Sequence, residues 1–281
     1  MNDGDSNNNL SLASWYPGHI KKARQEINRR LPKIDVLIEI VDSRAPVSSY
    51  SGVFEKYKSQ GKKHIILSNK TDLISEENTK IKPEFFSDKD FYFVNTKKKD
   101  SLKFLLNIIR EKNADKLEKL KKWGIKNKPV LVMIGGMPNV GKTSIISAIT
   151  GKNRLRIENR PGVTRSEQWI SLGDINILDT PGVFYPEFNN VEILYKLAIL
   201  NILKPQSMDF EKLFDFFWNN MNFHQQNIFK KHYKVENADT YTDFIECFGE
   251  INGIKGVDNI ATRIFSDYNK GKFKQILLDN F

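Results

Sequence analysis

The sequence predicts an α/β protein with a mostly parallel six-stranded sheet, followed by a smaller all-α C-terminal domain. Through the first two thirds of the chain, apolar runs rich in β-branched residues alternate with helical patterns, which is typical of parallel strands joined by crossover helices. From residue 190 onward the strand signals disappear and aromatic-rich helical patterns replace them. A chain of 281 residues that is 40% hydrophobic can bury an ordinary core in one large or two smaller domains.

Six short apolar runs mark the expected strands. The last two runs are joined by a tight Gly173-Asp174 turn, which is typical of a β-hairpin and gives the sheet one antiparallel edge. The expected strands are residues 34–41, 64–68, 91–94, 129–134, 168–172 and 175–178.

Helical patterns fill the gaps between these runs, at residues 20–31, 100–122 and 142–150. Pro186 and the following pair of asparagines break regular structure, so we expect a domain boundary near residues 184–190. The predicted organisation is a disordered tail over residues 1–14, a sheet domain over 15–187 and a helical domain over 188–281.

Composition excludes several classes of protein. The single cysteine, Cys247, can form neither an internal disulfide nor a zinc cluster, so cysteine usage gives no argument for secretion. No run approaches the roughly 18 apolar residues of a membrane-spanning helix, and the N-terminus resembles neither a signal peptide nor an Arg-rich transit peptide. We expect a soluble monomer without a membrane partner, in a bacterial-type cytoplasm rather than in a mitochondrion or another organelle. The formal net charge of +10 favours a polyanionic partner.

The first chemical motif is Gly136-Met137-Pro138-Asn139-Val140-Gly141-Lys142-Thr143, which follows an apolar strand and precedes a helix. Pattern and context are those of a phosphate-binding loop, whose glycines let backbone N–H groups turn toward phosphates at a helix N-terminus. Lys142 is expected to reach the β- and γ-phosphates and Thr143 to ligate Mg²⁺. The alternative is an ordinary Gly-rich turn. The expected nucleotide contacts here are Met137, Pro138, Asn139, Val140, Gly141, Lys142, Thr143 and Ser144.

Two further motifs end predicted strands. In Asp179-Thr180-Pro181-Gly182, the Asp179 carboxylate can hold Mg²⁺ through water, and the Gly182 N–H can bind a γ-phosphate. In Asn69-Lys70-Thr71-Asp72, Asp72 can accept from the ring N–H and the exocyclic amine of guanine, beside the Asn69 amide and under the Lys70 stem. A capping turn is the alternative for this second motif. The combination favours GTP over ATP.

The order of the motifs is unusual. Thr164 lies between the phosphate loop and the hairpin, where a mobile switch loop can close a threonine over Mg²⁺ and the γ-phosphate, although spacing alone also fits a plain loop. In Ras-like GTPases the phosphate loop comes first and the guanine motif late, whereas here residues 69–72 precede residues 136–143. The order therefore predicts a circular permutation, which a fold tolerates when its chain ends lie close together.

These motifs together resemble the circularly permuted GTPases of the YlqF/RbgA family, which act in assembly of the large ribosomal subunit. The resemblance implies a circularly permuted Ras-like P-loop GTPase domain, GTP hydrolysis to GDP and phosphate that ribosomal particles stimulate, and rRNA and ribosomal proteins as partners. Two departures are small: Ser43 stands where the family more often has Ala, and Asn95 and Thr96 are a poor copy of the Ser-Ala loop that backs the guanine. The resembling segments are Trp15 to His19, Asp42 to Arg44, Asn69 to Asp72, Gly136 to Ser144, Arg160 to Thr164, Asp179 to Gly182 and Lys270 to Phe273.

The catalytic group is implied by the resemblance. Ras-type GTPases orient the attacking water with a Gln directly after the Asp-to-Gly motif, and here that position is Val183, which cannot hydrogen-bond through its side chain. The resemblance nominates His19 instead, as an imidazole that orients or partly deprotonates water; without it, His19 reads as a residue that lines the first helix. Asn139 occupies the position whose side chain, in related GTPases, helps to hold K⁺ beside the phosphates; a loop asparagine in a tight turn is the alternative.

Charge is uneven along the chain. Residues 97–128 carry a net charge of +8 and residues 19–33 of +5, whereas residues 190–281 carry −1. The two basic segments can contact polyphosphate, although solvated helix faces are equally common for Lys-rich helices. We therefore predict a GTP-hydrolysing factor in late assembly of the large ribosomal subunit. The alternatives are a GTP-dependent switch with a protein partner and a nucleotide-gated RNA-binding scaffold with negligible turnover.

Overall fold

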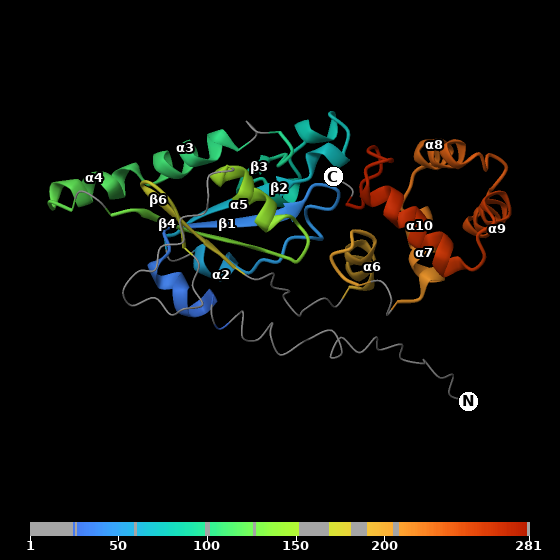
Figure 1. Cartoon of the computed structure of the whole chain (residues 1–281), viewed down its shortest axis with the longest axis horizontal. Helices are drawn as coiled ribbons and strands as arrows, with labels where there is room; N and C mark the ends of the chain where they lie inside the picture. The colour runs from blue at the N-terminus through green and yellow to red at the C-terminus, as the bar shows by residue number, and fades with distance from the viewer. Residues whose placement is uncertain are drawn as a thin grey trace.

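A computed structural model shows a sheet domain followed by a group of helices (Figure 1). Its long axis runs from the sheet domain, with α4 at the far end, to the helices α8 and α9 at the other end, and the chain after α10 turns back toward the sheet domain. The structure describes residues 25, 27–58, 61–98, 102–125, 128–151, 169–180, 190–204 and 208–279.

The sheet has six strands in the order β3-β2-β1-β4-β6-β5. Every neighbouring pair is parallel except β5 and β6, which are antiparallel. This confirms the predicted six-stranded, mostly parallel sheet and its hairpin edge, with strand ends shifted by one or two residues. The strands are β1 Val36–Asp42, β2 Lys63–Asn69, β3 Asp90–Phe93, β4 Val130–Gly136, β5 Trp169–Leu172 and β6 Ile175–Asp179.

Helices cover both faces of the sheet. In the central strand β1, Val36, Ile38 and Ile40 belong to a core that includes side chains of α3 (Lys103–Lys112) and α5 (Lys142–Thr150). Leu37 points to the opposite face, into a second core with Ile27, Leu31 and Phe54, the residue before α2 (Glu55–Lys58). Because both faces are buried, the central strands read as continuous apolar runs rather than alternating ones. Short 3-10 helices occupy Leu31–Lys33, Thr71–Leu73, Asn78–Lys80 and Glu84–Phe86.

The single helix predicted over residues 100–122 is wrong, because the structure has two helices there: α3 (Lys103–Lys112) and α4 (Ala114–Lys122). Asn113 separates them. Its side-chain amide donates to the carbonyl of Ile109 at 2.7 Å, and its backbone N–H turns to Arg110, three residues back. A side chain that takes the carbonyl of an α-helical bond competes with the helix and breaks its continuity.

The described residues from 190 onward form helices and no strand, as predicted. These helices pack through a core of aromatic rings, in which the rings of Phe229 and Phe244 lie 5.0 Å apart. The predicted boundary between residues 187 and 188 falls outside the described residues. The helices are α6 Val191–Ile199, α7 Phe210–Asn219, α8 Phe223–Tyr233, α9 Tyr241–Asn252 and α10 Val257–Asn269.

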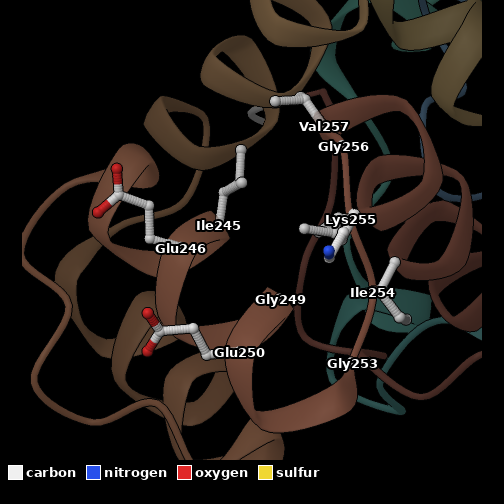
Figure 2. A pocket seen from close by; sticks show the side chains of 10 residues that line it. Ile245, Glu246, Gly249, Glu250, Gly253, Ile254, Lys255, Gly256 and Val257 are labelled. Carbon is white, nitrogen blue, oxygen red and sulfur yellow. The ribbon is translucent and has the colours of Figure 1, made fainter.

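A hollow of about 510 Å³ lies where α9 turns into α10 (Figure 2). Glu246 and Glu250 stand along α9 at one side of it, and Lys255 stands in the connecting loop. Two carboxylates at its wall make this hollow a poor site for phosphate. None of the helices that the structure describes is long and apolar enough to cross a membrane.

Candidate nucleotide site

The predicted motifs meet at the carboxyl ends of four neighbouring parallel strands. Asp42 ends β1 and lies opposite Asn69 at the end of β2. Gly136 ends β4 and pairs with Ile40 of β1, and Asp179 ends β6 beside β4. Ligands of open α/β sheets bind at this edge, where loops after several strands converge. The sheet topology therefore brings the guanine motif and the phosphate loop together although they are far apart in sequence.

The phosphate loop can take its shape only with glycine at two positions. Gly136 has φ of 137°, and a Cβ added there would lie 2.5 Å from the carbonyl oxygen of Ile40. Gly141 has φ of 101°, and its Cβ would lie 2.2 Å from the side-chain nitrogen of Asn69. Gly141 also occupies the N-cap position of α5, where a glycine has no side chain that could cap the helix. The N–H groups of its first turn are thus available to an anion.

Lys142 is buried at the start of α5, with only 8% of its surface exposed. Its ammonium donates to the carbonyl oxygens of Met137 at 2.8 Å and Gly136 at 3.3 Å. Burial lowers the pKa of Lys142 to about 8, against the opposing effect of the Asp179 carboxylate. The loop thus holds a poorly solvated cation, which an approaching phosphate would stabilise.

Oxygen ligands suited to Mg²⁺ lie at the same edge. Thr143 and Ser144 are exposed in the first turn of α5, and Asp179 is half-buried at the end of β6. Burial raises the pKa of Asp179, although Lys142 acts in the opposite direction. One carboxylate and one hydroxyl suit Mg²⁺, which keeps several waters and takes its other ligands from substrate phosphates. Within the described ranges, no cluster of three or more acidic, His or Cys side chains offers a protein-only metal cage.

The guanine motif is tied directly to the phosphate loop. The Asn69 amide nitrogen donates to the carbonyl of Val140 at 3.0 Å, and its amide oxygen is buried without a hydrogen-bond partner among the described residues. A buried polar atom of this kind is costly unless a further group satisfies it. Lys70 adopts the left-handed backbone region, with φ of 68°, and its ammonium lies 2.9 Å from the Asp42 carboxylate.

The loop after β3 lies beside the predicted base-binding carboxylate. Asp72 accepts from the ammonium of Lys97 at 2.6 Å, and the backbone N–H of Lys97 donates to the side chain of Asn95 at 2.9 Å. Asn95 is buried and Thr96 half-buried. The structure thus places residues 95–97 next to Asp72, where the sequence predicted the backing of the guanine.

Comparison with known proteins identifies the family. The chain is 34% identical over 273 residues to a probable ribosome biogenesis GTPase A of Mycoplasma genitalium, an alignment that covers 94% of this chain and 95% of the relative. The chain belongs to the ribosome biogenesis GTPase A family. A member from Thermotoga maritima is 30% identical over 268 residues, 92% of this chain and 91% of that protein. A family model described as 50S ribosome-binding GTPase matches residues 131–216.

A solved structure agrees on the fold. GNP-bound YlqF from T. maritima superposes with a TM-score of 0.61 at 23% identity, covering 89% of this chain and 94% of that one. The match to the GTPase model begins in β4, after the guanine motif. In this family member, Asn69 to Asp72 therefore precede the segment that matches the GTPase model. This is the motif order of the predicted circular permutation.

Arg44 is the residue of this family member that sequence reasoning undervalued. The sequence marks it only as part of Asp42-Ser43-Arg44, whereas in the structure Arg44 is buried, with 1% of its surface exposed. Its guanidinium donates to both oxygens of Asp42, at 2.9 Å and 2.8 Å, and this pairing holds the pKa of Asp42 well below its usual range despite the opposing effect of burial. The available signal was the position itself, because a charged pair directly after a buried strand faces the ligand edge.

Asn139 contacts the helical part of the chain. It has φ of 58°, and its amide nitrogen donates to the carbonyl of Asn201, just after α6, at 2.7 Å. The candidate catalytic His19, the candidate switch residue Thr164 and the candidate phosphate contact Gly182 lie outside the described residues, as does Val183.

Proposed function

We propose that the chain binds GTP and hydrolyses it to GDP and phosphate, as a factor in late assembly of the large ribosomal subunit. The observation that carries this proposal is the bond from Asn69 to the carbonyl of Val140, which joins the base-reading loop to the phosphate loop. Family membership supports the ribosomal role, and the description of the matching family model points to the 50S subunit.

The residues divide between base and phosphates. Asp72, which is half-buried, accepts from the two guanine donors, and a carboxylate paired with both of them discriminates strongly against bases that lack them. Lys142 and the N–H groups of the phosphate loop bind the phosphates, with Gly182 at the γ-phosphate. Thr143, Asp179 and Thr164 would hold Mg²⁺, which neutralises charge on the phosphate oxygens.

Two roles concern the chemical step. Asn139 would offer its amide oxygen to K⁺, because its nitrogen is engaged by Asn201. His19 would orient the attacking water, since Val183 has no hydrogen-bonding side chain. Both proposals make turnover dependent on groups that ribosomal particles can organise.

The basic segment supports an RNA partner. The last turn of α4 carries Lys119, Lys121 and Lys122, and the Trp123 that follows is 74% exposed. Cations with an exposed aromatic ring suit phosphate contact and base stacking. We propose that this end of the sheet domain faces rRNA, and that the chain works as a cytoplasmic monomer.

Nucleotide turnover tests the proposal. We expect GTP but not ATP to be hydrolysed, and large-subunit particles to raise the rate. Lys142→Ala should abolish turnover, whereas Lys212→Ala, at an exposed lysine of α7, should leave it unchanged. Turnover that particles do not stimulate under any condition would favour the scaffold, and particle binding without salt dependence would favour a switch with a protein partner.

A further inference from the structure

The segment after α10 returns toward the sheet domain (Figure 1), where it bonds to the loop after β2 that carries the guanine motif, here called the guanine loop. The carbonyl of Lys274 accepts from the backbone N–H of Ser75 at 2.8 Å, three residues after Asp72. The backbone N–H of Leu278 donates to the carbonyl of Arg44, also at 2.8 Å. Residues 270–279, here called the return segment, therefore form backbone bonds with both loops that border the expected base.

Arg44 links the guanine loop to α10 itself. Its guanidinium binds Asp42 on one side and donates to the side chain of Asn269 at 2.8 Å on the other. Asp42 in turn pairs with Lys70, the residue whose stem is expected to cover the base. Because these groups are buried or half-buried and hydrogen-bonded in series, movement of α10 either carries Arg44, Asp42 and Lys70 with it or breaks one of the bonds in the series.

The far end of the return segment is held by the Asp279 carboxylate. The Asp279 carboxylate accepts from the backbone N–H groups of Val47 and Ser48, at 2.7 Å and 2.9 Å, and from the Ser48 hydroxyl. Lys196 of α6 lies 3.2 Å from the same carboxylate. Charge-assisted bonds therefore flank the segment, from Arg44 to Asn269 just before it and from Asp279 at its end.

At Gly271 the backbone of the return segment packs closely against the guanine loop. It has φ of 82°, and a Cβ added there would lie 2.8 Å from the Leu73 side chain and 3.9 Å from the carbonyl oxygen of Asp72. Leu73 is buried, so its side chain has little room to move away. The backbone of the helical part thus lies directly against the residue that follows the base-reading carboxylate.

We propose that Arg44, Asn269 and the return segment are positioning elements for the guanine loop, so that the helical domain sets the affinity and selectivity for the base. This inference rests on the proposed guanine-nucleotide site. The contacts reach the loop for the base, so GDP and GTP are affected alike. A partner that shifts α10 and the return segment then tightens or loosens GDP and GTP by the same factor, because these contacts reach only the loop for the base; the bond from Asn139 to Asn201 is a separate contact, with the phosphate loop.

The test compares two glycines that share a backbone conformation. Gly271→Ala should push on Leu73, whereas Gly253, with φ of 65° at the end of α9, has open space around its Cβ position. Both variants of the full chain carry the strain of a positive φ, so Gly253→Ala controls for stability. The dissociation constants of GDP, a non-hydrolysable GTP analogue and inosine diphosphate, which lacks the exocyclic amine, are measured for each.

We expect Gly271→Ala to weaken GDP and the GTP analogue by the same factor, about tenfold, and to reduce the preference for GDP over inosine diphosphate. Gly253→Ala should change neither. Asn269→Ala provides a second variant, with Asn252→Ala as its control, because both amides donate to the carbonyl four residues earlier in a helix. Only Asn269 also reaches Arg44, so only its loss should reduce the preference for guanine.

The outcomes separate the two proposals. A wild-type chain without preference for guanine would overturn the proposed function and this inference together. A selective wild-type chain whose preference for GDP over inosine diphosphate survives both Gly271→Ala and Asn269→Ala would overturn the inference alone. Weakened binding with an unchanged ratio also overturns it, because that result describes a loss of stability rather than a displaced Asp72.

Discussion

Four of the five described helices of the helical part begin with a side-chain cap, with α10, which begins after Gly256, as the exception, whereas α5 at the phosphate loop begins after a glycine. In the helical part, α6, α7, α8 and α9 each begin with a side chain that accepts from the first turn: Asn190, Asp209, Asn222 and Thr240. In the sheet domain, α5 begins after Gly141 without such a cap. The capped helices satisfy their own N–H groups and gain stability, whereas α5 keeps those groups for a ligand.

Buried polar groups follow the same division. The sheet domain buries charged and polar side chains at its ligand edge, including Asp42, Arg44, Asn69 and Lys142. Among the described residues from 190 onward, Asp267 and Asp279 are the only buried polar side chains, and aromatic rings fill the interior. The interior of the helical part is therefore stabilising, whereas the sheet domain buries polar groups that lower its stability at the edge where the nucleotide is expected. Substitutions in the two parts can test that contrast.

The largest change in the free energy of unfolding is expected when an aromatic ring is removed from the core of the helical part. Phe229 is fully buried, and its ring lies 5.0 Å from those of Phe244 and Phe273. Phe229→Ala should lower the free energy of unfolding by about 3–5 kcal/mol, because transfer and cavity terms add. Urea denaturation measures the change.

Phe223, six residues earlier in the same helix, provides the control, since it is 77% exposed. Phe223→Ala should change the free energy of unfolding by less than about 0.5 kcal/mol. Equal effects of the two substitutions would show that the aromatic core does not stabilise the helical part.

A substitution in the sheet domain is expected to raise the free energy of unfolding, by a smaller amount. Burial holds the pKa of Lys142 at about 8, below its unfolded value, so at pH 7 the folded chain retains a charged group in a poorly solvated place. Lys142→Met removes that penalty but leaves the carbonyls of Gly136 and Met137 without its donor. We expect a net gain of about 2 kcal/mol in stability at pH 7, with loss of nucleotide binding.

The pH dependence of stability checks the sign of the effect expected for Lys142→Met. A lysine whose folded pKa is depressed binds fewer protons in the folded state, so wild-type stability should rise from pH 8 toward pH 10 through this group. The advantage of Lys142→Met should shrink over the same range, as urea denaturation at pH 7 and pH 9.5 would show. A variant that is less stable than wild type at pH 7 contradicts this account.

The sequence predicts the features that depend on local patterns and misses those that depend on tertiary contacts. The strands and the phosphate loop follow from local patterns, since apolar runs and Gly-rich turns carry their own signals. The break at Asn113 was missed because asparagine also fits inside a helix, and only the bond to Ile109 shows that it ends one. The role of Arg44 depends on Asn269, 225 residues away. No local pattern predicts contacts made by tertiary packing.

The smallest expected effect tests the caps directly. Thr240 and Asp243 form a reciprocal capping box at the start of α9, with bonds of 3.1 Å and 2.9 Å. Thr240→Ala should cost about 1 kcal/mol of stability, measured by urea denaturation, and should leave the GDP affinity of the folded chain unchanged. Thr242→Ala, two residues along the same helix and exposed, controls for the substitution. If Thr240→Ala weakens GDP as strongly as it destabilises the fold, caps and binding edge are not separate devices, and the contrast between the two parts fails.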